Sequence, residues 1–536
     1  MLNLVSKKEQ SKSYKLEKVA SIGIETILYL VVIPLVISLF LKAIIDIDNN
    51  YDPGWYHLPF AGRIWGILPR EMFLGDEKWF EPRFDGFPLL AHFLQGFFWK
   101  ITGRIQSTNL VGFLSIIGYF FFLRVYFKVP FYLSAIALLS IPLVLTNATT
   151  SYVDLFGNVG TSILVMMTYS FYKNKQLPNF QELLIAFIGA AIAVNTKTQL
   201  QPLVLFILIF TISRLAWLYW QQKPAAKQIV KTLLVTLLAI VIIYASPVKN
   251  TVVYANPLYP IKIQVAGIVL NHKLDPEAFE ESNRQINWIT SVLEINAPYF
   301  WKPDQWSDFP ERNRRGGFFG AYVVFNLLLL AGFLLREMTF NKYLLINRNR
   351  TDFTQLKTEQ GNLAKSREAI VAFLTLLVIS IVPLNFPQSH ELRYFMYWMI
   401  CLVSLNLYLI SLPKNRQLLG RWLQPTYMGL VYVVFLIIVL VKIGSFYARP
   451  LFLSLDKYVV HGAKSEFIEQ IKPNEQVCLL ARHMGEDTQT APTASLKYAF
   501  IYSSYFHPEL DYDYSIQTAF DPQACGDRPR IPSNLK

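Results

Sequence analysis

Long apolar runs separated by short polar segments form the main pattern along this chain of 536 residues. A helix needs about 20 mostly apolar residues to cross a bilayer. By this criterion we predict eleven membrane-spanning helices, at residues 19–45, 108–124, 130–147, 155–172, 181–196, 200–220, 229–247, 317–336, 369–386, 393–412 and 425–445. The predicted fold class is therefore an all-α polytopic membrane protein, with a transmembrane domain over 1–445 and a separate domain over 446–536. Two long segments, 46–107 and 248–316, interrupt the transmembrane domain.

The segment 46–107 carries two further helical patterns. The first consists of large apolar residues at helical spacing: Trp55, Leu58, Ala61, Trp65 and Leu68. The second, over 88–102, places one set on a stripe (Leu89, Phe93, Gly96, Phe97 and Ile101) and leaves His92, Gln95 and Lys100 off it. Amphipathic helices of this kind usually lie in the plane of the membrane interface. We therefore expect both helices to lie on the bilayer surface.

The composition agrees with a membrane protein. Hydrophobic residues make up 53% of the chain and charged residues only 16%, whereas soluble domains carry about 25% charged residues. The net charge of +13 could indicate a nucleic-acid partner. However, the basic residues gather in short segments between apolar runs, which is the positive-inside pattern. The expected partner is a lipid bilayer, with no nucleic acid.

The basic segments also predict an orientation. With eleven spans, the Lys- and Arg-rich segments at 7–18, 124–128, 173–175, 214–231, 336–367 and 414–421 all fall on one side. That side is expected to be the cytoplasm, so the N-terminus would be cytoplasmic and the C-terminus external. The first apolar run is too long for a cleavable signal peptide. We expect a multi-pass protein of a bacterial plasma membrane whose long segments face the periplasm.

The C-terminal segment 446–536 is predicted to be a small external α/β domain. It contains an amphipathic pattern near 463–471 and a strand-like run at 476–481. Cys478 and Cys525 both lie in it, and they would form either a disulfide in an oxidising compartment or two free thiols. Cys401 lies inside an apolar run and is expected to be a small buried residue.

Three carboxylates, Asp46, Asp48 and Asp52, emerge where the chain leaves the first apolar run. A carboxylate beside an apolar surface can act as a general base, and we predict this role for Asp52. Nearby His57 and Arg63 would orient groups or bind anions. The alternative is that Asp52 merely begins an ordinary turn through Pro53 and Gly54.

Two further acidic positions lie in external segments. Asp85 follows Arg83 closely, and Arg83 would either pair with it or hold a phosphate. Asp154 begins a predicted span on the same side as Asp52. Because carboxylates are favourable at helix N-termini, capping is a sufficient explanation for Asp154.

Three basic or titratable residues complete the candidate set. Lys197 lies in an outer turn, where a positive charge departs from the basic-inside trend and favours an anionic partner. His390 and Arg393 lie in a compact cluster that opens a span. Arginine suits bidentate recognition of phosphate, and snorkelling from a helix end is the alternative.

Neither a metal-ligand spacing of Cys and His nor a P-loop or dinucleotide fingerprint occurs in the sequence. A reaction on the external side therefore needs an activated donor that is already outside. No cofactor is required by these residues, although acids near a phosphate could bind a divalent metal ion.

Together these segments resemble the GT-C superfamily of polytopic glycosyltransferases, the enzymes related to protein O-mannosyltransferases and aminoarabinose transferases. The resemblance covers about residues 20–445 and depends on the order and sidedness of short motifs. These are the Tyr-His-Leu-Pro segment after Asp52 (56–59), the Pro-initiated helix at 87–91, Tyr-Val-Asp-Leu (152–155), Asn-Thr-Lys (195–197), Asn-Pro-Leu-Tyr-Pro (256–260) and Glu-Leu-Arg-Tyr (391–394). The segment 446–536 brings no resemblance of its own.

The resemblance implies an inverting transfer from a polyprenyl-phosphate sugar donor at the outer membrane face. The acid of the first external loop would be the base, which maps to Asp52, and Lys197, Arg393 and Arg83 would hold the lipid phosphate. Many family members carry an Asp-Glu pair where this chain has Asp52-Pro53, so Asp48 remains a competing base. The acceptor stays open among a glycolipid, a polysaccharide and a protein.

Two other classes of function compete with the transferase. A lipid or solute transporter or flippase would need ionisable or helix-breaking residues at mid-membrane depth, and the predicted spans hold few. A non-catalytic GT-C-like scaffold would keep the helices without an acid–base pair. The location of Asp52, Lys197 and Arg393 on one side favours the enzyme, because fold resemblance alone does not establish function.

Overall fold

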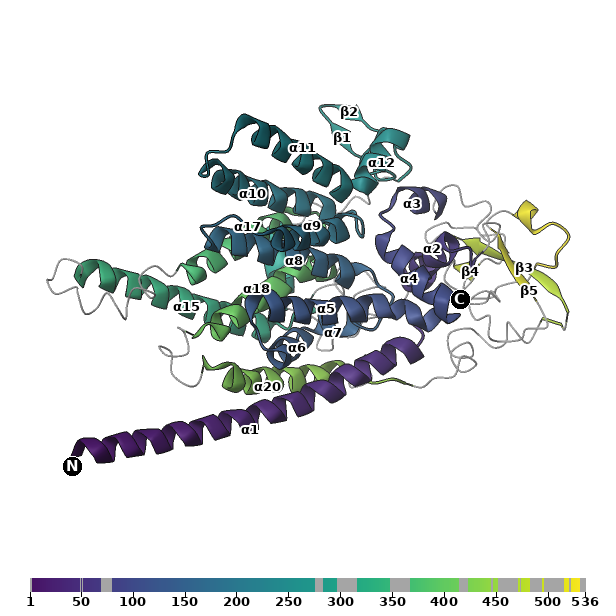
Figure 1. Cartoon of the computed structure of the whole chain (residues 1–536). Coiled ribbons are helices and arrows are strands. Elements are labelled where there is room, and N and C mark those ends of the chain that lie inside the picture. The colour runs from purple at the N-terminus through teal and green to yellow at the C-terminus, as the bar shows by residue number, and fades with distance from the viewer. Residues whose placement is uncertain are drawn as a thin grey trace.

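The computed structural model describes residues 2–48, 50, 52–68, 80–274, 283–295, 316–347, 367–413, 423–444, 447–451, 471–472, 474–482, 494–495, 515–519 and 522–530. These residues form a helical bundle with small strands at one end (Figure 1). The membrane-domain helices are α1 (Leu2–Ile45), η1 (Pro53–His57), α2 (Leu58–Ile64), α3 (Phe80–Gly86), α4 (Leu90–Thr102), η3 (Ile105–Asn109), α5 (Leu110–Phe127), α6 (Phe131–Leu139), α7 (Pro142–Asn147), α8 (Asp154–Lys173), α9 (Phe180–Val194), α10 (Leu200–Trp220), α11 (Ala226–Ile243), α12 (Ala245–Tyr254), α13 (Arg284–Val292), α15 (Gly320–Asn347), α17 (Glu368–Asn385), η4 (Leu392–Phe395), α18 (Met396–Ser411) and α20 (Pro425–Ile443).

Eight helical segments in the described ranges are long and apolar enough to cross a membrane. They are Ser21–Ile45, Ile105–Phe127, Leu200–Trp220, Ala226–Ile243, Gly320–Thr339, Glu368–Asn385, Leu392–Ser411 and Pro425–Ile443. This confirms the prediction of a mainly helical, polytopic membrane protein.

The other three predicted spans are also helical but do not meet the same length and apolarity. Residues 130–147 form α6 and α7, which are separated at Pro142, where Ile141 is extended (φ −89°, ψ 113°). Proline is accepted at the first turn of a helix but cannot continue the preceding one. Helix α9 is short, with 15 residues, and α8 carries polar residues along its buried face.

Helices α8 and α18 form the centre of the bundle. Every residue of α18 is buried, and α8 contacts α5, α9, α10 and α18. At the periphery, α11 exposes a run of leucines, with Leu233, Leu234, Leu237 and Leu238 between 57% and 63% exposed. Exposed leucine side chains suit lipid rather than water. A helix can lie in lipid because it satisfies its own backbone hydrogen bonds.

The first predicted surface helix differs from expectation. Instead of one helix to Leu68, the chain forms the π-helical turn η1 followed by the short α2. The prediction that its apolar residues lie on the bilayer is wrong for α2, because Leu58, Phe60 and Ala61 are all within 1% of complete burial. They are covered because α4 packs closely on α2: a Cβ on Gly96 would lie 2.3 Å from the carbonyl oxygen of Ala61.

Helix α4 confirms the second predicted helix and gives its direction. Its stripe of Phe93, Phe97 and Ile101 is exposed (45%, 38% and 60%), whereas His92 and Gln95 are buried at 2% and 0%. The polar face therefore points into the protein and the apolar face points outward. This reverses the usual arrangement in water and fits an element whose outer solvent is lipid.

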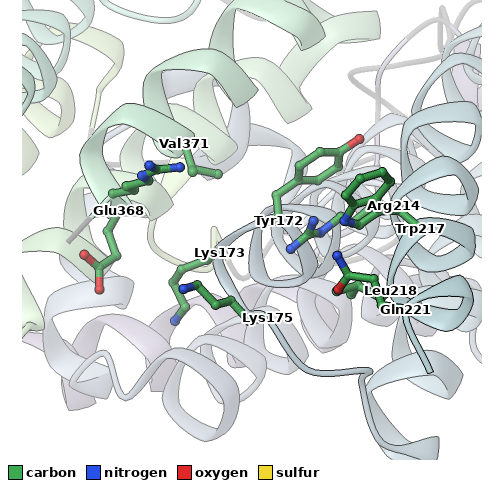
Figure 2. Close-up of a pocket in the computed structure, with 10 residues that line it drawn as sticks. Tyr172, Lys173, Lys175, Arg214, Trp217, Leu218, Gln221, Glu368 and Val371 are labelled. Atoms are coloured by element: carbon green, nitrogen blue, oxygen red, sulfur yellow. The ribbon is translucent and has the colours of Figure 1, made fainter. Parts of the chain in front are cut away.

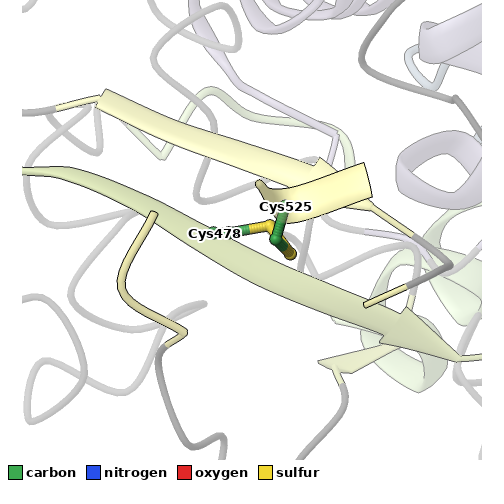
Figure 3. The surroundings of a disulfide bond; sticks show 2 residues. All are labelled: Cys478 and Cys525. Carbon is green, nitrogen blue, oxygen red and sulfur yellow. A yellow bond between two sulfur atoms is a disulfide. The ribbon is translucent and has the colours of Figure 1, made fainter. Parts of the chain in front are cut away.

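The C-terminal segment contributes three short strands. Strand β3 (Gln476–Arg482) pairs in parallel with β4 (Ala494–Ser495) on one side and with β5 (Ser515–Ala519) on the other. The strand predicted at 476–481 is confirmed, whereas the helix predicted near 463–471 falls outside the described residues except for Ile471. A disulfide joins Cys478 of β3 to Cys525 of η7 (Pro522–Cys525), so the paired alternative holds (Figure 3). Cys401 is a buried free thiol, as predicted.

The end of the bundle where α1 finishes is the end that carries the candidate chemistry. Figure 1 shows α1 running along the bundle to this end, where α2, α3 and α4 and the C-terminal strands also lie. Helices α8 and α18 begin here, and α9 ends here. A two-stranded hairpin, β1 (Gln264–Val265) with β2 (Ile268–Val269), follows α12.

Candidate functional site

The first two acids after α1 hold the chain where it leaves that helix. Asp46 accepts hydrogen bonds from Lys42 Nζ (2.7 Å) and from the backbone N–H of Leu451 (3.0 and 3.1 Å). Asp48 accepts the backbone N–H of Ser151 (2.6 Å) with one oxygen, and the backbone and side-chain N–H groups of Asn50 (2.9 and 2.6 Å) with the other. Both oxygens of Asp48 are thus occupied by fixed donors that tie this loop to the start of α8.

Asp52 is the third acid and has a different environment. Asp52 directly precedes η1 and has a helical backbone conformation (φ −60°, ψ −41°). It therefore leads into a helical turn and does not begin an ordinary turn. Its Oδ2 lies 2.8 Å from Nη1 of Arg393, and the side chains are 12% and 13% exposed. The same guanidinium donates to Glu391 through Nε (3.3 Å) and to the Tyr394 hydroxyl through Nη2 (3.2 Å).

A second ion pair lies beside the first. Lys197, in the turn between α9 and α10, donates to Asp154 at the start of α8. Asp154 is 1% exposed, and its Oδ2 has no hydrogen-bond partner among the described residues. Asp154 therefore serves as the partner of Lys197 and does not make a side-chain cap. Burial lowers the pKa of the Lys197 ammonium, and the Asp154 charge opposes that shift.

Both cations lie close to the Tyr394 ring. Lys197 Nζ lies 4.1 Å from the ring centroid, and Arg393 Cζ lies 5.1 Å from it. A cation within about 6 Å of an aromatic face is attracted to the ring. Two positive groups are consequently held near each other by two carboxylates and one shared ring.

Two buried histidines line the same region. His57 Nδ1 lies 2.8 Å from His92 Nε2, and His57 Nε2 has no partner among the described residues. Burial, with the neighbouring His92 and Lys197, holds the pKa of His57 well below its usual value. Burial and Lys197 lower the pKa of His92 to about 3. Both rings are therefore neutral at pH 7, and one proton is shared along the bond between them.

Of these groups, His57, His92, Lys197 and Tyr394 line a cavity of about 70 Å³, whereas Asp52, Asp154 and Arg393 are not among its lining residues. Its lining comes from η1, α4 and the residues before it, the residue before α8, the turn after α9, the segment after α12 and η4: Tyr56, His57, Phe87, Pro88, His92, Val153, Thr196, Lys197, Thr198, Gln199, Ile261 and Tyr394. Thr196 Oγ1 has no hydrogen-bond partner in the described part of the chain. Small-molecule sites usually enclose about 300–1,000 Å³. This conformation can therefore admit a small polar group, and a sugar would require the cavity to open.

The remaining predicted residues also lie outside the lining of this cavity. Arg63 binds both oxygens of Glu81 (2.7 and 2.9 Å) and lies over the Phe84 ring at 4.1 Å, so an internal carboxylate occupies its fork. Arg83 and Asp85 lie on α3. Asp85 is exposed, and its backbone carbonyl accepts from Lys249 Nζ. His390 is buried and its carbonyl accepts the Ser291 hydroxyl at 2.7 Å.

The structure also adds functional candidates that the sequence did not single out. Tyr394 lies close to both cations, and Thr196 lines the cavity next to Lys197. Tyr394 follows Arg393 and Thr196 precedes Lys197 in the sequence. Their position next to two predicted residues was the feature of the sequence that could have identified them. Among the described residues, three or more His, Cys, Asp or Glu side chains nowhere gather as a metal site.

No model of a known protein family, no curated protein and no solved structure matches this chain.

Proposed function

We propose that this chain is a membrane glycosyltransferase that moves a sugar from a polyprenyl-phosphate donor to an acceptor at the outer face. The observation that carries this proposal is the pair of buried ion pairs, Asp52–Arg393 and Lys197–Asp154, beside a cavity at one end of the bundle. A displacement at an anomeric carbon needs a carboxylate to accept a proton and cations to stabilise a departing phosphate. Both kinds of group lie within one cluster here.

The proposed reaction begins with a change of partner for Arg393. In the resting state Asp52 and Arg393 neutralise each other, and an arriving phosphate competes for the guanidinium because arginine binds phosphate bidentately. Asp52 is then released to accept the proton of the acceptor hydroxyl. The acceptor oxygen attacks the anomeric carbon as the bond from that carbon to the lipid-phosphate oxygen breaks.

The leaving lipid phosphate carries the electron pair of the broken bond. Arg393 and Lys197 would stabilise that negative charge, and their burial strengthens the interaction because the local dielectric is low. Neutral His57, with its partnerless Nε2 at the cavity, would donate or accept a hydrogen bond to the bound donor. No metal ion is needed for these steps, and a divalent cation remains an optional partner of the phosphate.

The geometry favours Asp52 over Asp48 as the base. Three fixed N–H donors hold Asp48, two through the backbone, so using it would dismantle the loop after α1. Asp52 has a side-chain partner that a ligand can recruit. The proposal therefore assigns the base to Asp52 and a structural role to Asp48.

The proposal includes eleven membrane crossings with a cytoplasmic N-terminus in a bacterial plasma membrane. Helices α6 with α7, α8 and α9 would complete the set, since each lies in the bundle among the eight apolar helices. The ion-pair cluster then lies on the external side, together with the disulfide-bonded C-terminal segment, where an oxidising compartment favours such a bond.

The test is sugar transfer in right-side-out membrane vesicles. Vesicles containing the full chain receive a panel of polyprenyl-phosphate hexoses and pentoses labelled in the sugar, and release of polyprenyl phosphate is measured with label in any acceptor. We expect Asp52→Asn to lower the rate about 10²–10⁴-fold, the usual contribution of a general base. Asp527→Asn, an exposed acid of the C-terminal segment, is the matched control and should retain the wild-type rate.

Three results would contradict the proposal. Full transfer by a correctly inserted Asp52→Asn variant would remove the base, and loss in Asp48→Asn with normal thermal stability would move it to Asp48. Absence of donor turnover by the wild type across the whole panel would refute the transferase, and movement of intact donor across the bilayer would then identify a flippase.

A further inference from the structure

A second, larger pocket lies at the end of the bundle opposite the ion-pair cluster. It has a volume of about 540 Å³ and opens between the ends of α8 and α10 and the start of α17 (Figure 2). Helix α8 links the two places, because Asp154 is its first residue and Lys173 its last. At 1.5 Å per residue these ends are about 28 Å apart, close to the thickness of a bilayer's apolar core.

The lining of this pocket is strongly basic. Lys173, Lys175, Arg214 and Arg367 carry positive charge, and Glu368 is the one carboxylate among the lining residues. The four cations come from three separate parts of the chain and line one space; Figure 2 labels three of them, Lys173, Lys175 and Arg214. Four positive charges and one negative charge leave an excess of three positive charges.

The cations are held in place by neutral groups. Arg214 donates from Nε to the carbonyl of Phe171 (3.0 Å) and from Nη2 to the carbonyl of Asn174 (2.7 Å). Lys173 Nζ donates to the Tyr408 hydroxyl at 2.7 Å. The two contacts of Arg214 are to neutral carbonyl oxygens, so they fix its guanidinium without cancelling its charge.

Aromatic residues indicate the level of the pocket relative to the membrane. Trp217, which lines it, and Trp220 are 61% and 71% exposed at the end of α10. Exposed tryptophans at helix ends are typical of the membrane–water interface. On the two helices that border the pocket, Ile209 of α10 is 55% exposed and Leu377 of α17 is 49% exposed. A ligand in this pocket would thus have charge at the interface and an apolar surface beside it.

We propose that this pocket binds the phosphate headgroup of an anionic diacyl phospholipid, with the acyl chains lying on the exposed apolar faces of α10 and α17. Basic pockets between transmembrane helices are known to hold anionic headgroups. A free phosphate would use the basic lining but not the adjoining apolar surface. The proposal does not depend on the glycosyltransferase assignment, since none of its residues belongs to the ion-pair cluster.

The test uses the full chain purified in detergent with phosphatidylglycerol and phosphatidylcholine of identical acyl chains. Native mass spectrometry measures how many copies of each lipid stay bound, with and without sodium phosphate. We expect preferential retention of phosphatidylglycerol that sodium phosphate does not abolish. The double variant K175Q/R367Q should bind it about 25-fold more weakly, at roughly fivefold per cation.

The variants are chosen so that misfolding does not mimic the result. Lys175 and Arg367 are exposed. The matched control is R124Q, which changes an exposed arginine in the last turn of α5 and should retain wild-type binding. A further variant, Arg214→Gln, removes the cation that is held by two backbone carbonyl groups. Equal retention of the two lipids, or phosphatidylglycerol binding unchanged in K175Q/R367Q, would overturn the proposal. So would sodium phosphate binding in the pocket in place of lipid.

Discussion

Variants of the buried ion pair between Lys197 and Asp154 can distinguish a structural role of this pair from a catalytic one. The perturbation is a set of three variants: Asp154→Leu, Lys197→Met, and both together. Each single change leaves the opposite charge in a site where the side chains of Lys197 and Asp154 are 11% and 1% exposed. The double change replaces the pair by apolar side chains of comparable size.

The expected energies follow from desolvation. Removing one partner of a buried pair costs about 3–5 kcal/mol, because the remaining charge is uncompensated. Asp154→Leu also leaves Lys197 near the like charge of Arg393, so we place it at the upper end of that range. Replacing both partners by apolar groups is often neutral or stabilising, and the double variant should therefore lie within about 1 kcal/mol of wild type.

The assay measures the free energy of unfolding in mixed micelles and sugar transfer in vesicles on the same proteins. If Lys197 serves the leaving phosphate, the double variant should recover its stability and still transfer sugar at least about 10²-fold more slowly, as expected when a preorganised charge is removed. A stable double variant with the wild-type rate would show that the pair only supports the fold. Two singly changed proteins as stable as wild type would refute the burial argument itself.

Three further results are expected. Burial lowers the pKa of His92 to about 3. Below pH 6.5, the ordinary pKa of histidine, His92 therefore takes up a proton in the unfolded chain but stays neutral in the native chain. The stability that His92 contributes should be complete above pH 6.5 and fall by about 1.4 kcal/mol per pH unit toward pH 3, and His57, whose pKa is also lowered, adds to the fall; apparent melting temperatures should show this, with a shallower slope in His92→Asn. Gly96→Ala should push α4 off α2, where the Ala61 carbonyl lies 2.3 Å from the new methyl, and cost about 1–3 kcal/mol; an unshifted melting temperature would contradict that packing. Cys478→Ser opens a loop of 47 residues and should cost the C-terminal segment about 4 kcal/mol, read as faster proteolysis there, whereas Cys401→Ser should leave that rate unchanged.

Much of the helical architecture could be predicted from the sequence, because length and apolarity alone determine whether a helix suits a bilayer. Stretches such as 200–220 and 425–445 contain little but apolar residues, and α10 and α20 match them closely. The more polar α8 was also located, although its apolarity falls short of the eight candidate spans. Its polar residues are buried against other helices, a compensation that no local pattern records.

The candidate site was predictable only in part. Sidedness placed Asp52 and Arg393 at the same face, but their contact joins residues 341 positions apart. Nothing local indicates which of several acids a given arginine binds, and this is why Arg63 was expected near Asp52 and instead binds Glu81. The burial of α2 was missed for a similar reason, since its cover is α4, and the close approach depends on Gly96.

Helix α4 has two attachments of different physical kinds. Its inner face is joined to the protein by polar contacts, such as the 2.6 Å hydrogen bond from Gln95 to the Ser151 carbonyl, while its outer face of Phe93, Phe97 and Ile101 is partly exposed, with the Trp65 ring against Phe93 and Phe97. We therefore expect the bilayer to complete the wall that carries His92. Extraction into a thin detergent shell would weaken this wall while the central helices stay folded. An inactive but monodisperse preparation should then regain function on transfer to lipid nanodiscs, so the choice of solubilising medium acts on the cavity before it acts on the fold.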